Sequence, residues 1–310
     1  MPAKGARTCI LGATFTISFI APAFADPAPD FATLLRQARA APRIAASEAD
    51  VAAAEARARQ ARAWTNPTLS IEAENFGGQG VMEGFDSAET TFSIGQTFEL
   101  FGKREARIEA AALDATAARF LSQRDTAEFS AELANAYARA EAAGKLRMLA
   151  AEAVSLAEAD ARTARALVDA GREAELRGVQ AEADLARARA EFVDAEADEA
   201  SAFLRLTALA GSSAPLDSIA VSLLTREPSA LSGGATKSPT LAAADAQWRA
   251  AEARQRAEER RWAPDITITG GVRTFEATDE TALVAGFSIP LPFFDQNRGG
   301  SDAARSEARA

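Results

Sequence analysis

The sequence predicts a mainly α-helical fold with a β-barrel contribution: a long coiled-coil hairpin of helices joined to two membrane β-hairpins. Three observations predict it. From Thr91 to Leu100 apolar and polar residues alternate, as in a strand with two unlike faces. From Lys103 the chain is rich in alanine, arginine and glutamate, with no proline before Pro215, and this composition favours long helices. The pattern of helix, strand, strand and helix then begins a second time.

The repeat is the most informative feature of the sequence. Residues 42–71 align without gaps on residues 239–268, with identical residues that include Pro67 and Pro264. Chance in alanine-rich sequence does not explain the matched prolines or the strands that follow them in both copies. The sequence therefore contains two structural repeats, and we expect the second to be incomplete.

The first 25 residues are typical of a secretory signal peptide. A basic region with Lys4 and Arg7 precedes a mostly apolar run, and alanines at positions 23 and 25 suit signal peptidase. A transmembrane anchor is the alternative, but the apolar run is far shorter than the ~20 residues that span a bilayer. We therefore expect cleavage after Ala25 and export of the mature chain.

The parts of the chain follow in order. Residues 1–25 form the signal peptide, and residues 26–210 form the first repeat, with a helical region over 30–63, a β-hairpin over 66–101 and a long helical hairpin over 103–209. Residues 211–238 form a connector with scattered glycine, serine and proline, and residues 239–310 form the second repeat, with a helix, a β-hairpin over 264–291 and the start of a helix.

The residue types argue against several kinds of chemistry. The only cysteine, Cys9, lies in the signal peptide, and the sequence has no histidine. A tight zinc or copper site is therefore not expected, and nucleophiles activated by an imidazole are excluded. The formal net charge of −10 argues against a nucleic-acid partner. We expect no catalytic residues, no resident metal, no cofactor and no enzyme activity.

The helical hairpin is long and has a coiled-coil pattern. As one helix, Lys103 to Asp169 would extend about 100 Å, and a second helix from Arg172 to Leu209 about 57 Å. Apolar residues in the second helix alternate spacings of three and four, which is typical of a coiled-coil seam. The predicted seam is Leu176, Val179, Ala183, Ala186, Ala190, Val193, Ala197, Ala200 and Leu204.

The strands are expected to form a membrane barrel. Each hairpin alone would leave open edges and an uncovered apolar face, and a barrel shared between subunits would remove both. The runs approach the ~9 to 11 residues that a membrane strand needs. A small sheet packed on a helical bundle is the alternative. The predicted lipid-facing residues are Leu69, Ile71, Phe92, Ile94, Phe98, Ile266, Ile268 and Phe287.

Polar residues on the other strand faces would line the lumen. Glu72, Glu74 and Glu99 would favour the passage of cations. Ordinary solvation of a wide pore explains them equally well. Trp64 and Trp262 precede the strand prolines, where they are either interfacial anchors or packing residues between helix and barrel.

Three segments resemble the outer-membrane efflux proteins of the TolC type: residues 66–78, 89–104 and 289–298, the last reading IPLPFFDQNR. The likeness is greatest to the branch that serves cobalt, zinc and cadmium resistance. It implies a homotrimer with a 12-stranded barrel in outer-membrane lipid and an α-helical tunnel in the periplasm. It also implies docking on a periplasmic adaptor and an inner-membrane RND pump.

The resemblance also implies a docking tip and a longer chain. Ala170, Gly171, Arg172 and Glu173 form the turn farthest from the membrane, where the family meets its adaptor. A simple glycine stop between helices is the alternative reading of this turn. In the family a second helical hairpin follows the second pair of strands, whereas this sequence stops at Ala310. We therefore expect a C-terminally truncated chain.

Other functions remain as alternatives. Within the channel reading these are drug efflux and type I protein secretion, because the pump makes most of the choice of substrate. A periplasmic adaptor, or membrane fusion protein, would have one helical hairpin inserted in a split β domain, and the repeat argues against it. A secreted structural coiled coil would leave the two-faced strands unexplained.

Overall fold

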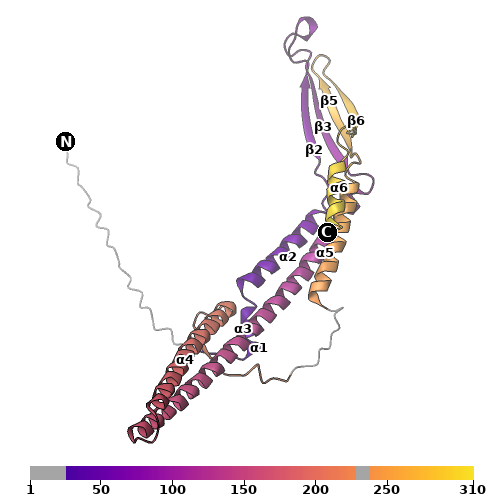
Figure 1. The fold of residues 1–310 in the computed structure, drawn as a ribbon. Coiled ribbons are helices and arrows are strands. Elements are labelled where there is room, and N and C mark those ends of the chain that lie inside the picture. The colour runs from indigo at the N-terminus through magenta and orange to yellow at the C-terminus, as the bar shows by residue number, and fades with distance from the viewer. Residues whose placement is uncertain (1–25, 228–237) are drawn as a thin grey trace, which may run out of the picture. The chain divides into compact units, whose positions relative to one another are not determined.

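The computed structural model in Figure 1 describes residues 26–227 and 238–310. The predicted signal peptide and part of the predicted connector lie outside the described residues. The chain forms two compact units: one holds the residues up to Ala38 with Ala134–Arg226, and the other holds Arg39–Leu133 with Glu227–Ala310. Helix α3 (Lys103–Asp169) contributes to both units.

The second unit contains one four-stranded antiparallel sheet. Its strands are β2 (Thr68–Glu74), β3 (Glu89–Phe98), β5 (Ile266–Phe275) and β6 (Glu280–Ser288), in the order β2-β3-β5-β6. The two predicted hairpins are therefore joined, because β3 pairs with β5 along its whole length. A Cβ atom at Gly271 would lie 2.3 Å from the Phe92 carbonyl oxygen, so this close pairing requires glycine.

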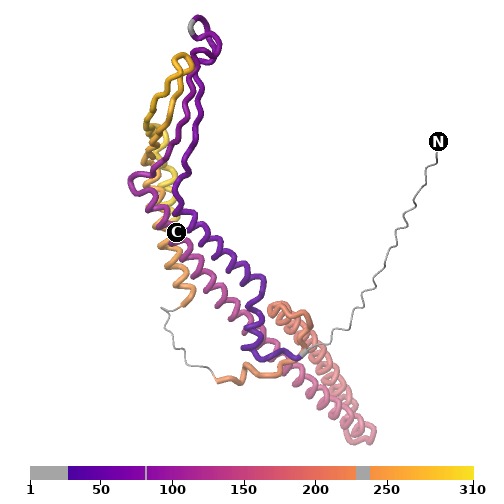
Figure 2. Tube along the Cα trace, turned by 180° about the vertical axis from the view of Figure 1, so that it is seen from behind, coloured from indigo at the N-terminus to yellow at the C-terminus, as the bar shows by residue number. Residues whose placement is uncertain are grey.

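The helices of the second unit pack against the first part of α3 and against one another. Helix α2 (Pro42–Gln60) lies along the first part of α3, where the Arg119 guanidinium donates to Glu55 Oε1 at 2.6 Å (Figure 2). Helix α5 (Pro239–Glu259) contacts α3 through small residues, with Ala117, Ala246 and Ala250 buried together. The short helix α6 (Arg298–Glu307) packs on α5. Alanine contacts let these helices approach closely.

The junction of β3 and α3 is a short turn. Phe101 and Gly102 have φ angles of 56° and 73°, in the left-handed region that favours glycine. Arg260 Nη1 donates to the Gly102 carbonyl oxygen at 3.0 Å, and a Cβ atom at Gly102 would lie 2.9 Å from the same nitrogen. The strand was expected to extend to Leu100. Strand β3 ends at Phe98, because the chain then turns at Phe101 and Gly102.

The first unit surrounds the base of the helical hairpin. The second part of α3 packs against α4 (Glu175–Ala210), beside the short helix α1 (Phe31–Ala38). Two short parallel strands, β1 (Asp26–Ala28) and β4 (Leu216–Ile219), pair nearby. The rings of Phe31 and Tyr137 meet edge to face with centroids 5.9 Å apart.

The N-terminal helical region is broken, which the sequence analysis did not predict. Helix α1 ends at Ala38 and α2 begins at Pro42, whereas one helical region over 30–63 was expected. Ala41 has ψ of 141°, because the residue before a proline avoids the helical region. In the described ranges, no helix is both long enough and apolar enough to cross a membrane.

Candidate functional site

The apolar face of the sheet is the exposed one. Residues directly opposite each other share a face, and the register places Leu69 opposite Ile94 and Ile71 opposite Phe92. Ile268 and Phe287 are opposite each other on the same face. Six of the eight predicted lipid-facing side chains are exposed, from 48% at Phe92 to 73% at Phe287: Leu69, Ile71, Phe92, Ile94, Ile268 and Phe287.

Phe98 and Ile266 complete the predicted set. They pair at the end of the sheet nearest the helices and are half-buried, and the ring of Phe98 lies 6.4 Å from that of Trp64. The prediction omitted Val272 and Leu283, which share this face; Leu283 is 88% exposed. Their alternation with polar residues was visible in the sequence. Contact of this face with lipid stays a prediction.

The opposite face of the sheet is polar and carries ion pairs. Arg273 Nη2 lies 3.0 Å from Glu74 Oε2, and its Nη1 lies 2.9 Å from Glu89 Oε2. Its Nε donates to Thr91 Oγ1 at 2.9 Å. Glu72 lies on the same face, opposite Thr91, and is exposed. The predicted lumen set contained Glu72 and Glu74 but missed Glu89 and Arg273, because only the strand register brings these together.

Glu99 lies elsewhere than expected. It was expected on the polar face of the second strand, but it follows β3 because strand pairing ends at Phe98. Its carboxylate accepts hydrogen bonds from both Nε and Nη2 of Arg107, whose Nη1 donates to the Ala61 carbonyl oxygen at 2.6 Å. An ion pair therefore compensates the charge of Glu99. Its exposure to a lumen remains a prediction.

The two tryptophans lie at the ends of helical segments. Trp64 is 62% exposed, and the Arg104 guanidinium carbon lies 4.5 Å from the centre of its ring. Trp262 is also exposed. Arg104 Nη2 donates to the Arg62 carbonyl oxygen at 2.6 Å, which fixes the cation over the ring. Both tryptophan side chains are therefore largely exposed, and their role as interfacial anchors stays a prediction.

The predicted docking tip is an exposed, well-ordered turn. Gly171 has a φ angle of 67°, and its backbone N–H donates to the Val168 carbonyl oxygen. The backbone N–H of Arg172 donates to the Leu167 carbonyl oxygen. This is a Schellman arrangement, in which glycine ends a helix and its last carbonyls are satisfied. Ala170, Gly171, Arg172 and Glu173 are all exposed. Adaptor contact at this tip stays a prediction.

Ion pairs between the helices hold the tip in register. Arg177 Nη2 lies 2.9 Å from Asp160 Oδ1, and Arg165 Nη1 lies 2.5 Å from Glu182 Oε1. Both pairs join α3 to α4. Each pair is solvent-exposed and contributes little to stability alone.

Helix α4 has two stripes of residues with heptad spacing. The stripe that is buried within the chain is not the predicted one. Leu176, Val179, Val193 and Leu204 are each at least 55% exposed. The residues that pack inward lie on another stripe of the helix, and the buried ones are Gly178, Ala181, Phe203, Leu206 and Ala210. The prediction was wrong on this point because both stripes have coiled-coil spacing. The predicted stripe, which exposes Leu176, Val179, Val193 and Leu204, is called the outer seam.

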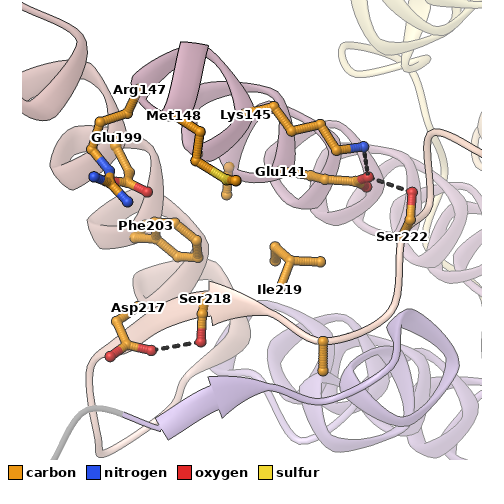
Figure 3. A pocket seen from close by; sticks show the side chains of 13 residues that line it. Glu141, Lys145, Arg147, Met148, Glu199, Phe203, Asp217, Ser218, Ile219 and Ser222 are labelled. Atoms are coloured by element: carbon orange, nitrogen blue, oxygen red, sulfur yellow. Dashed lines mark hydrogen bonds and ion pairs between the residues drawn. The ribbon is translucent and has the colours of Figure 1, made fainter. Parts of the chain in front are cut away.

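A buried carboxylate secures the base of the hairpin. Glu141 accepts a hydrogen bond from Lys145 Nζ at 2.6 Å and one from the Ser222 hydroxyl (Figure 3). The backbone N–H groups of Leu223 and Leu224 also donate to it, at 2.8 and 3.2 Å. Burial raises the pKa of Glu141, but these donors together outweigh burial and lower it to about 2. Glu141 thus holds the segment after β4 against α3.

A tyrosine supports the same attachment. Tyr137 is fully buried and donates through its hydroxyl to the Val221 carbonyl oxygen at 2.7 Å. Burial and the neighbouring Glu141 carboxylate raise the pKa of Tyr137. A cavity of about 360 Å³ lies beside these residues, with Met148, Phe203 and Ile219 in its lining (Figure 3). The groups there bind one another, which indicates a structural role.

The described residues present several exposed surfaces of different chemical character. Among residues 26–227 and 238–310, no three His, Cys, Asp or Glu side chains are grouped so that they could hold a metal ion. What the chain presents is a sheet with an exposed apolar face, a polar face with paired charges, an exposed tip and an outer seam. Such an arrangement can line a path and bind partners.

Residues 34–212 match the family described as outer membrane efflux protein. The nickel-cobalt-cadmium resistance protein NccC of Alcaligenes xylosoxydans xylosoxydans is 41% identical over 283 residues, covering 90% of this chain and 64% of that protein. The nickel and cobalt resistance protein CnrC of Cupriavidus metallidurans is 40% identical, covering 96% and 72%. The cobalt-zinc-cadmium resistance protein CzcC of the same organism is 28% identical, covering 80% and 59%.

A solved structure of CusC superposes with a TM-score of 0.72 at 19% identity, covering 90% of this chain and 70% of that one. This likeness confirms the predicted fold class, with its helical hairpin and paired strands. The expected likeness to metal-resistance proteins is also confirmed, although NccC and CnrC are nearer than CzcC. The chain spans 64% of the length of NccC. By its family match and by these relatives, the chain belongs to the outer membrane efflux protein family.

Proposed function

We propose that the chain is a subunit of a homotrimeric outer-membrane channel, a passive conduit through which heavy-metal cations leave the cell. The observation that carries the proposal is the reversed polarity of the sheet. In water, apolar side chains are buried and charges are exposed. Here Ile94 is 61% exposed on one face, while Thr91 is buried on the other. An apolar face of this size suits contact with lipid.

The sheet also supports association with further copies. Strands β2 and β6 are its edges and lack partners in the described sheet order. Unpaired edges inside a bilayer would leave backbone groups without hydrogen bonds, so closure requires strands from elsewhere. Pairing β6 of one copy with β2 of the next gives a closed ring by rotational symmetry. A trimer is the state implied by the family resemblance.

The helical hairpin supports the same assembly. The outer seam of α4 exposes Leu176 and Val193, and α3 exposes Leu146, Leu149 and Leu156, each of the five by at least 60%. Heptad-spaced apolar residues on a helix need a second helix to cover them. We propose that the outer seam of one copy packs on α3 of its neighbour. The tunnel wall would then be built from helices of all copies.

The cargo and the other partners follow from the relatives. The name of NccC refers to resistance to nickel, cobalt and cadmium, and that of CnrC to nickel and cobalt. The name of CzcC refers to cobalt, zinc and cadmium. We propose divalent cations of this group as the cargo, a choice that the acidic polar face of the sheet favours. The exposed tip at Gly171 would dock on a periplasmic adaptor, which in turn joins an inner-membrane RND pump.

A fractionation and growth experiment tests the proposal. The gene is expressed in a host that lacks its own channel of this type but retains an adaptor and pump. We expect a protein in the outer-membrane fraction that begins at Asp26, crosslinks as a trimer and restores growth on nickel, cobalt or cadmium. A soluble periplasmic product would contradict the membrane assignment. Correct insertion without any gain in metal resistance would contradict the cargo.

A further inference from the structure

Arg273 is the only basic residue in the part of the chain that forms the sheet and its distal loops. Residues 68–98 and 266–288 contain eight acidic residues and this single arginine. Arg273 lies on β5, on the polar face, near the end of the strand that is farther from the helices. A lone guanidinium in such an acidic region has a large share in the local potential.

The contacts of Arg273 reach across three strands. Its three nitrogens contact Glu74 on β2 and both Thr91 and Glu89 on β3, at 2.9 to 3.0 Å. Glu74 and Glu89 are directly opposite each other in the register, and like charges in that position repel. The guanidinium lies between them and binds both. Asn75 Nδ2 also donates to Glu89 Oε1 at 3.1 Å, so this carboxylate is held on two sides.

The remaining charges on this face have no such compensation. The register brings two further carboxylates onto the face: Glu72 opposite Thr91, and Glu280 opposite Phe275. Both are exposed. The face therefore holds four carboxylates and one guanidinium, and the guanidinium is paired with two of the four.

We infer that Arg273 sets the charge selectivity of this end of the pore. The inference rests on the proposed channel function and identifies a specificity-determining residue for it. With Arg273 present, Glu74 and Glu89 are occupied by an internal cation, and Glu72 and Glu280 give a moderate preference for cations. Moderate attraction suits conduction, because ions must enter the site and also leave it. Without the guanidinium, two facing carboxylates would be available to passing ions.

The test measures reversal potentials of the purified protein in planar lipid bilayers across a KCl gradient at low ionic strength. We expect Arg273→Gln to raise the permeability of K⁺ relative to Cl⁻ by roughly twofold, an effect that added salt screens. Arg273→Lys keeps the charge and is expected to match the wild type. A wild-type reversal potential in a conducting Arg273→Gln channel would overturn the inference.

A charge-matched variant separates selectivity from a purely structural role. Arg273→Gln combined with Glu74→Gln removes the ion pair but leaves the net charge of the face unchanged. We expect its reversal potential to return to the wild-type value, whereas a structural role predicts that it stays altered or that conduction is lost. If the wild-type protein forms no conducting pore, the channel function itself fails and the inference falls with it. Wild-type conduction with unaltered variants overturns the inference alone.

Discussion

The sheet and the base of the helical hairpin differ in which side chains they bury. The hairpin base buries a carboxylate, whereas the sheet exposes apolar side chains. At the hairpin base Glu141 is 5% exposed, meets four donors and lies near the buried Tyr137. In the sheet Ile94 is 61% exposed, and the ion-paired residues lie on the less exposed face. A buried charge is tolerated in a protein in water when hydrogen bonds satisfy it, as at the hairpin base, whereas an exposed apolar face is unusual there. The proposed contact of the sheet with lipid would account for this difference.

The largest expected effect comes from placing a charge on the apolar face. Ile94→Arg puts a guanidinium where we propose lipid, and its burial near the bilayer midplane costs ~2 to 4 kcal/mol. We expect loss of the trimer from the outer membrane, measured by fractionation and crosslinking. Ser93→Arg is the matched control, because Ser93 lies on the polar face, and we expect it to assemble. Equal behaviour of the two variants would show that the faces are misassigned.

At the hairpin base, removing the charge of Glu141 should destabilise one unit. Glu141→Gln leaves Lys145 without its buried partner and weakens the hydrogen bonds from Leu223 and Leu224. We expect the free energy of unfolding of this region to fall by roughly 2 to 3 kcal/mol. The rate of hydrogen exchange at the Leu223 and Leu224 amides measures this change in the free energy of unfolding. Glu152→Gln, an exposed change on the same helix, is the control and should leave exchange unaltered.

The same carboxylate predicts a dependence on pH. The pKa of Glu141 is about 2 in the folded chain, below its ordinary value of 4.5. The unfolded state therefore binds more protons between these values, so stability is full above pH 4.5 and falls as the pH drops toward 2. We expect a loss on the order of 3 kcal/mol over this window, from urea unfolding. Glu141→Gln should lose this part of the pH dependence, and its persistence would assign it to other groups.

The outer seam offers a smaller effect, confined to association. Val193→Glu places a charge on the outer seam, at a side chain that is 60% exposed in its own helical pair. We expect the unfolding free energy to change by no more than ~0.5 kcal/mol, while the fraction of trimer in detergent falls. Ser201→Glu introduces the same charge at an exposed position on neither seam. If both variants form trimers equally well, the outer seam is not a contact between copies.

The parts that the sequence predicted are those with strong local signals. The bounds of α3 follow from its composition and from Gly171, and strand alternation identifies the apolar face. The parts that it missed depend on distant contacts. Strands β1 and β4 are too short to have a pattern of their own and exist because they pair. The choice between two heptad stripes on α4, like the meeting of Arg273 with Glu74, is made only by three-dimensional packing.

The smallest expected structural effect belongs to the tip, where function alone should change. Arg172 and Glu173 are exposed and lie in the turn between the two helices. Exchanging their charges with Arg172→Glu and Glu173→Arg keeps the net charge, the turn glycine and the outer seam. Folding, trimer yield and outer-membrane insertion should therefore match the wild type.

Exchanging the charges of Arg172 and Glu173 should, in contrast, weaken docking on the adaptor. If the tip meets a partner through complementary charges, reversing them places like charges together, which lowers affinity and slows association. We expect reduced growth on nickel, cobalt or cadmium and reduced crosslinking of the tip to the adaptor. Gln180→Glu, an exposed change on α4 after the turn, is the control for a charge near the tip. Unchanged resistance together with unchanged crosslinking would mean that these four residues do no more than reverse the chain between two helices.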